Sequence, residues 1–440
     1  MRDRVPHGPG AIGAGPVLLY SDPLLTSLGS LCMLVARLTA HFGPGGPMAE
    51  DKRTRLLELR SEDRKLKEYG LEETPSPGAY THRDRYRRTM HFQSVDRIPN
   101  HEFGYWDDTL VRWHHEGLPA EVDSNWAADV FFGFDPTGGV PVHMGINPGY
   151  QHEVLEETDR YKIIRGGDGA KCMVYTDGSS TIPHYIEFPL KDRQTWEEDF
   201  KHRINPDDPA RYGVDWDAVR KNLVGRDYPA GIGFGSLFGW IRNWMGFEGV
   251  SLTCYDDPDL IVEVMEQVTV MIEKILNYSL EQYSDLDFAS GWEDMCFNHG
   301  PIISPKMFKE WMVPRYKRIT DILHKHGIDV VITDCDGNIN ELVGLWIEGG
   351  VNCMFPLEIN SGTIPAELRA QYGQQVLLAG GVDKIQLARG RDEIEQEIER
   401  LRPTVESGGF IPHVDHRVPP DVSYENYLYY LKVKRQAFCS

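Results

Sequence analysis

From residue 228 onward, short apolar runs alternate with longer amphipathic stretches. The apolar runs read YPAGIGFG, DLDFASGW, IDVVITD, VNCMFP, QVLLAGG and FIPHV, and the stretches between them have the apolar spacing of helices, as in SPKMFKEWMVPRYKRITDILHKHG. Strands that alternate with helices predict parallel βαβ units. Strands this continuously apolar predict a sheet that is buried on both faces.

Two architectures fit such a pattern, a closed (β/α)8 barrel and an open doubly wound sheet. The open sheet usually carries a glycine-rich phosphate loop, and neither GxGxxG nor GxxxxGK[ST] occurs in residues 81–440. A barrel takes about 250 residues and exceeds 400 with insertions. We therefore predict an α/β fold of the (β/α)8 TIM-barrel type.

The regions before residue 228 are less regular. Residues 81–92 predict a helix and VDRIPNHEFG a first strand, so the barrel is expected over 81–440. Residues 105–227 are rich in Trp, Tyr, Gly and Pro, with β-like runs YKIIR and CMVYTD, and are interpreted as an insertion after the first strand. Residues 1–80 predict an N-terminal extension, helical from residue 48 and partly disordered. Residues 1–47 differ in composition, and Met48 is the expected natural start.

Charge and cysteine content narrow the classes of partner. The formal net charge of −21 disfavours nucleic acid and anionic lipid as partners. The sequence contains no run of about 20 apolar residues, so no membrane span is predicted. The seven cysteines are scattered and form no CxxC pair, which favours a reducing cytoplasm over a disulfide framework. A small-molecule substrate is the partner class that remains.

Polar residues gather directly after the predicted strands. They are His101-Glu102, Trp292-Glu293-Asp294, Asp334 and Asp336, Glu358, and the run from His413 to His416. Catalytic groups of barrels come from the carboxyl ends of several strands. We expect these side chains to meet at that face.

Asp334 and Asp336 are two residues apart at a strand end, so both side chains can point the same way. Paired carboxylates repel unless a cation or a proton lies between them. Together with His416 they would form a metal site suited to Zn, Fe(II) or Mn. The alternative is that Asp336-Gly337 forms a turn and that Asp336 or Asn338 caps the next helix.

Other strand-end residues are candidates for proton transfer. Asp294, Glu358, His413 and Asp415 are predicted as catalytic acids or bases. For the histidines, a buried structural role is the competing interpretation. Ser304, before Pro305, predicts a helix cap rather than a nucleophile.

The sequence resembles the uroporphyrinogen decarboxylase superfamily over residues 81–437. The resemblance lies in RYRRTMHFQSVDRIP, WEDMCFNHGPIISPKMFKEW, DCDGNINELVGLWIEGG, LLAGGVDKIQL and the ending GGFIPHVDHRVPPDVSYENY. It implies a (β/α)8 barrel, and it extends to the corrinoid-linked methyltransferases of that superfamily. Their zinc-binding pattern places Asp334, Asp336 and His416 at ligand positions, with carboxylates and an imidazole in place of a histidine and two thiolates.

This resemblance implies a metal-dependent methyltransferase. The expected cofactors are a divalent metal, with zinc favoured, and cobalamin carried by a corrinoid protein; that protein and a second copy of the chain are the candidate protein partners. Without thiolates the metal is a stronger Lewis acid, so a tetrahydrofolate-like acceptor fits better than a thiol. Substrate contacts are expected from His101, Glu102, Tyr105 and Trp292. A decarboxylase or other lyase, and a non-catalytic barrel that binds a corrinoid protein, are the alternatives.

The resemblance also implies one activity that should be absent. True uroporphyrinogen decarboxylases hold substrate carboxylates with an arginine-rich loop after the first strand, whereas this chain reads HEFGYWDD there. Purified protein should therefore form no coproporphyrinogen from uroporphyrinogen above the rate without protein. Appreciable product, measured by fluorescence after oxidation to porphyrin, would contradict this interpretation.

Overall fold

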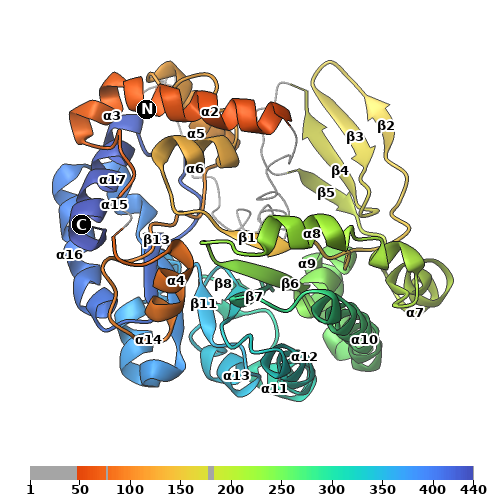
Figure 1. Ribbon diagram of the computed structural model, residues 1–440. Helices are drawn as coiled ribbons and strands as arrows, with labels where there is room; N and C mark the ends of the chain where they lie inside the picture. The colour runs from red at the N-terminus through yellow and green to blue at the C-terminus, as the bar shows by residue number, and fades with distance from the viewer. Residues whose placement is uncertain (1–46, 76–77, 177–182, 440) are drawn as a thin grey trace, which may run out of the picture.

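The computed structural model describes residues 47–75, 78–176 and 183–439 (Figure 1). The predictions of partial disorder and of a different origin for the first residues fall on 1–46, outside the described residues. The predicted helical extension is present. It comprises α2 (Pro47–Glu62) and α3 (Arg64–Tyr69), which Asp63 caps by accepting a hydrogen bond from Leu66 N.

A seven-stranded sheet, entirely parallel, forms the centre of the molecule. Its order is β1 (Gly138–Val140), β6 (Ala230–Gly235), β7 (Phe288–Trp292), β10 (Val331–Asp334), β11 (Cys353–Phe355), β12 (Leu377–Val382) and β13 (Phe410–Val414). Helices follow the strands and pack around them (Figure 1). The predicted fold class, a TIM-barrel-like α/β fold, is confirmed.

An extended segment, residues 100–105, lies where the first barrel strand was predicted. Asn100 O accepts a hydrogen bond from Asp135 N just before β1, and Tyr105 forms a parallel bridge with Val418 just after β13. Between these points the Glu102 carboxylate accepts a hydrogen bond from Val414 N at 3.0 Å. A side chain thus supplies part of the pairing that a regular strand would provide through its backbone.

The helices of the barrel begin with α4 (His82–Met90), and Thr81 caps it. Those after β6 are α9 (Phe238–Asp256), α10 (Pro258–Gln282), α11 (Pro305–Trp311), α12 (Val313–Lys325), α13 (Val343–Glu348), α14 (Pro365–Tyr372), α15 (Lys384–Arg389), α16 (Arg391–Glu406) and α17 (Tyr424–Phe438). Short 3-10 turns, η5 (Ile359–Ser361) and η6 (Gly373–Gln375), flank α14. Ser304 accepts a hydrogen bond from Met307 N, which confirms it as the cap of α11. No helix of the described residues is long and apolar enough to cross a membrane.

The predicted insertion, residues 105–227, is not one continuous excursion, because it contains the barrel strand β1. Before β1 lie α5 (Asp107–His115) and α6 (Asn125–Phe132). After it comes an antiparallel sheet of β2 (Glu153–Glu157), β3 (Tyr161–Arg165), β4 (Lys171–Tyr175) and β5 (His184–Glu187), which projects at the upper right of Figure 1. The chain returns through α7 (Arg193–Thr195), η2 (Trp196–Phe200), η3 (Lys201–Ile204), η4 (Pro209–Tyr212) and α8 (Trp216–Leu223). A two-stranded pair, β8 (Cys296–Phe297) and β9 (Gly300–Pro301), follows β7.

A buried ion pair joins the amino-terminal ends of two barrel strands. Asp287, just before β7, accepts hydrogen bonds from Ala230 N at 2.9 Å and from Arg226 Nη2 at 2.7 Å. The side chains of Asp287 and Arg226 are both fully buried. Asp287→Ala should lower the free energy of unfolding by about 3–5 kcal/mol, because it removes the fully buried carboxylate shared by Arg226, Arg83 and Arg87 and leaves Arg226 only the longer ion pair with Asp285 at 3.3 Å. Asp285→Ala is the control. Its side chain is 55% exposed, so the loss should stay under about 1 kcal/mol. Equal losses in chemical denaturation would contradict the assignment.

Candidate functional site

Three carboxylates meet at the carboxyl ends of β7 and β10. The two strands are parallel neighbours with Trp292 opposite Asp334, and Glu293 N donates a hydrogen bond to Asp334 O at 2.8 Å. Asp294 then turns toward Asp334 and Asp336 through a left-handed backbone conformation, with φ at 42°. One carboxylate oxygen of each of the three lies within 4.8 Å of the others, and all three are buried.

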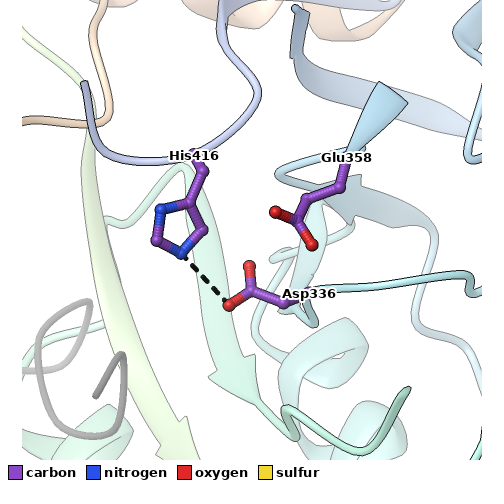
Figure 2. A group of neighbouring side chains, drawn as sticks. All are labelled: Asp336, Glu358 and His416. Carbon is purple, nitrogen blue, oxygen red and sulfur yellow. Dashed lines mark ion pairs between the residues drawn. The ribbon is translucent and has the colours of Figure 1, made fainter. Parts of the chain in front are cut away.

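Asp336 also belongs to a second group, with Glu358 and His416. Glu358 follows β11 and His416 follows β13, and the ligand atoms of these three residues also lie within 4.8 Å of one another. Figure 2 shows the His416 ring directed at Asp336, with Nε2 at 3.3 Å from Oδ2. Side chains that follow β10, β11 and β13 therefore meet in this group.

The metal set predicted from the sequence is divided between these groups. Asp336 is common to both, whereas Asp334 is grouped with Asp294, and His416 is grouped with Glu358. The set Asp334, Asp336 and His416 stays a prediction.

The alternative prediction was that Asp336-Gly337 forms a turn and that Asp336 or Asn338 caps the next helix. It is only partly correct. Gly337 does form a turn, with φ at 85°, where a Cβ would lie 2.6 Å from Cys296 O. However, α13 begins only at Val343 and its N-cap residue is Leu342, so neither Asp336 nor Asn338 caps it. The turn positions Asp336 without using its carboxylate.

Burial and mutual repulsion disfavour the ionised form of the carboxylates in the first group, Asp294, Asp334 and Asp336. Burial, together with the charge of Asp336, raises the pKa of Asp294 to about 7. Burial and the charges of Asp294 and Asp336 raise the pKa of Asp334 well above its usual value. Burial alone would lower the pKa of His416, but Asp336 outweighs it and the net direction is upward. The group therefore favours a bound proton or a bound cation.

Lys384 and Asp415 support the second group from behind. Lys384, the first residue of α15, donates from Nζ to Glu358 Oε1 at 2.9 Å and to Asp415 Oδ1 at 3.4 Å. Asp415 is fully buried and also accepts hydrogen bonds from the backbone of Ile359 and Lys384. Burial raises its pKa to about 6. Through these contacts Asp415 joins two loops, and its catalytic role stays a prediction.

Arg242 and Glu293 are functional candidates that the sequence did not single out. Arg242, buried in α9, has Nη2 at 3.6 Å from Asp294 Oδ2. Glu293 accepts hydrogen bonds from the backbone of Leu237, Phe238 and Gly239 and from the hydroxyls of two further residues, which ties the start of α9 to the end of β7. The position of Glu293 after a strand was visible in the sequence, but its role was not. Arg242 is inside a helix, where arginine usually indicates an exposed face.

His413 and His101 line a cavity of about 140 Å³ inside the barrel, beneath the carboxylates. Phe103, Phe288 and Phe355 form much of its apolar wall. His413 Nδ1 lies 2.9 Å from Val414 O, which orients the ring. Burial lowers the pKa of His101 to about 4, so its imidazole is neutral near pH 7. Both histidines are accessible to a ligand in this cavity, but they are not in the carboxylate groups.

The remaining predicted substrate contacts are dispersed. Glu102 lines the same cavity, although its carboxylate is engaged by Val414 N and by Tyr430 Oη. Trp292 lies beside Trp240 in another cavity, of about 320 Å³, at the ends of β6 and β7. Tyr105 is fully buried and its hydroxyl lies 2.7 Å from that of Tyr427. Tyr105 packs among buried aromatic side chains, and its predicted substrate contact stays a prediction.

Comparison with known proteins shows which family this chain matches. The sequence model described as "Uroporphyrinogen decarboxylase (URO-D)" matches residues 217–436, half of the chain, and the match includes both carboxylate groups. A solved methyltransferase from Methanosarcina mazei is similar with a TM-score of 0.51 and 13% identity, over 81% of this chain and 99% of that one. A B12-independent methionine synthase from Shewanella sp. W3-18-1, in complex with selenomethionine, has a TM-score of 0.36 and 12% identity, over 70% and 80%. No curated protein matches the chain. The likeness to the Methanosarcina mazei structure shows the fold alone.

The raised pKa of Asp294 predicts how stability depends on pH. Because its folded pKa of about 7 exceeds the usual value of 3.8, the folded protein binds more protons than the unfolded chain between these values. Ionisation of Asp294 therefore costs stability as pH rises from about 4 to about 7. In EDTA, Asp294→Asn should be more stable than the native protein at pH 7.5, and the difference should vanish near pH 4. Thermal unfolding across pH measures this difference. A variant less stable at pH 7.5 would contradict it.

Proposed function

The chain belongs to the uroporphyrinogen decarboxylase family, and from that premise we propose that it is a metal-dependent methyltransferase. The reaction would move a methyl group between a corrinoid protein or a methylated small molecule and an acceptor. The observation that carries this proposal is the convergence of Asp294, Asp334, Asp336, Glu358 and His416 at the carboxyl ends of the barrel strands. In barrel enzymes, this is the face where catalytic groups lie.

The residues present fit a divalent cation. Asp294 Oδ1 and Asp334 Oδ1 are buried acceptors with no hydrogen-bond partner among the described residues. Buried acceptors without a partner are costly, and a cation would satisfy them. Four carboxylates and one imidazole suit Zn, Mn or Fe(II). Such an ion would supply Lewis acidity toward a substrate oxygen or nitrogen.

The surrounding side chains would position the ligands and handle protons. Lys384 holds the Glu358 carboxylate in place, and Asp415 holds the loop that begins at Ile359. Without a bound ion, burial and the charge of Asp336 raise the pKa of Asp294 to about 7, whereas a cation ligated by Asp294 would keep its carboxylate ionised. Glu358 lies in the group of Asp336 and His416, and His413 lines the cavity inside the barrel. With Asp294 and Glu358 as metal ligands, we assign proton transfer to His413 and a positioning role to Asp415.

The ligand chemistry favours one class of methyl acceptor. Neither group that could hold a metal, among the described residues, contains a cysteine. Without thiolate ligands a metal keeps more of its positive charge, which suits activation of an electrophile better than delivery of a thiolate. A tetrahydrofolate-like acceptor is therefore proposed rather than a thiol. The six described cysteines are free and buried, which suits a cytoplasmic reaction.

A second candidate function, a lyase that decarboxylates a small acid, is favoured by Arg242. This arginine is buried beside Asp294, and its Nε and Nη2 have no hydrogen-bond partner among the described residues. A guanidinium with unused donors is well suited to bind a carboxylate. Release of CO2 from small carboxylic acids, with loss of the activity in Arg242→Lys, would favour this function over methyl transfer.

Variants of the two histidines after β13 test the methyltransferase proposal. His416→Ala should lower the metal content and reduce demethylation of methylcobalamin by at least about 100-fold, because a lost metal ligand is not replaced by its neighbours. His413→Ala should retain the metal and lose activity. The checks are elemental analysis and the visible absorbance of methylcobalamin, with a screen of acceptors. Full metal content in His416→Ala with metal loss in His413→Ala would contradict the assignment.

A further inference from the structure

We infer that the site holds two divalent cations, bridged by the carboxylate of Asp336. One cation would bind Asp294, Asp334 and Asp336, and the other would bind Asp336, Glu358 and His416. This inference rests on the proposed function in placing metal at this face of the barrel. It adds the number of ions and the division of the ligands between them.

The geometry supplies two sets of three ligands rather than one. Each set contains three ligand atoms within 4.8 Å of one another, and the sets share only Asp336. Asp294 and Asp334 belong to the neighbouring strand ends of β7 and β10, whereas Glu358 and His416 come from the strand ends of β11 and β13. A carboxylate has two oxygens, so Asp336 can ligate a different cation with each. Two-metal sites of this kind hold their ions about 3.5–4 Å apart.

Unsatisfied acceptors point to a cation in the first set independently of that geometry. Asp294 and Asp334 are 3% and 4% exposed, and Oδ1 of each has no hydrogen-bond donor among the described residues. Glu293, one residue away and equally buried, has both carboxylate oxygens satisfied by donors. The local fold can therefore satisfy a buried carboxylate, but it leaves Asp294 and Asp334 open toward each other.

The distribution of positive charge explains why one ion is not sufficient. The second set has a protein cation at hydrogen-bonding distance, since Lys384 donates to Glu358 at 2.9 Å. In the first set Arg242 lies 3.6 Å from Asp294 without a hydrogen bond, and the charge of Arg417 acts on Asp334. A single ion between Asp336 and His416 would leave Asp294 and Asp334 as a buried pair of carboxylates that could be ionised together only at the cost of mutual repulsion. A second ion removes that repulsion.

The two positions differ in ligand chemistry. The first set offers carboxylate oxygens alone, which suit Mg²⁺ or Mn²⁺. The second set includes an imidazole, which suits Zn²⁺, Mn²⁺ or Fe²⁺. Glu358 also accepts a hydrogen bond from Gly337 N at 2.8 Å, which holds its carboxylate toward Asp336. Mn²⁺ is compatible with both sets and is therefore the probe of choice.

The test is a titration of the full-length, EDTA-treated protein with Mn²⁺. Equilibrium dialysis should give two ions per chain, and electron paramagnetic resonance should show the spectrum of a spin-coupled pair. His416→Ala and Asp294→Asn should each retain one ion and lose the coupling. Asp336→Asn should weaken both sites by at least about tenfold. Asp383→Asn is the matched control, because Asp383 is a buried carboxylate after β12 outside both sets. It should keep two coupled ions.

The outcomes separate this inference from the proposed function. One ion per chain, removed by His416→Ala and by Asp294→Asn alike, would overturn the two-ion site and leave a metal-dependent enzyme. Two ions without spin coupling, or an Asp336→Asn variant that retains one tight ion, would overturn the bridging role of Asp336. No bound Mn²⁺ in a protein whose circular dichroism shows it to be folded would overturn both the inference and the proposed metal dependence.

Discussion

The parallel pairing of β7 with β10 brings negative charges together in a buried place. With Trp292 opposite Asp334, the residues that follow both strands emerge side by side, and Asp294, Asp334 and Asp336 come within a few ångströms of one another. Water cannot screen these charges effectively because all three side chains are buried. A proton or a cation must therefore accompany the folded state, and the rest of the site is organised around that requirement.

Two different kinds of support surround the carboxylates. Glu358 and Asp415 are held by Lys384 and by backbone amides, so their positions are determined by the protein alone. Asp294 and Asp334 receive little comparable support, and Arg242 approaches only one of them. The rigid half of the site can hold its geometry without a ligand, whereas the other half needs one. This asymmetry is what a binding site for a cation requires, because ligands that were already satisfied would gain little from it.

Much of the fold and part of the site could be predicted from the sequence. Alternating apolar strands and helices after residue 228 are a strong local signal, and the sheet confirms them. The strand β1 was missed because Gly138–Val140 has only three residues and no apolar run. Placing polar residues after strands correctly located the face of the site, but it could not decide which side chains meet. The grouping of Asp334 with Asp294, and of His416 with Glu358, depends on side-chain direction and on the left-handed turn at Asp294. Tyr105 shows the same limit, because its neighbour Tyr427 is distant in the sequence.

Anomalous X-ray diffraction from crystals of the metal-free protein soaked in Mn²⁺ would test this account most directly. The account predicts anomalous peaks at the carboxyl ends of β7, β10 and β13, one between Asp294, Asp334 and Asp336 and one between Asp336, Glu358 and His416. Clear density for these side chains without an anomalous peak, and with Asp294 and Asp334 joined by a shared proton, would contradict it. The carboxylates would then be a protonated structural cluster rather than a metal site.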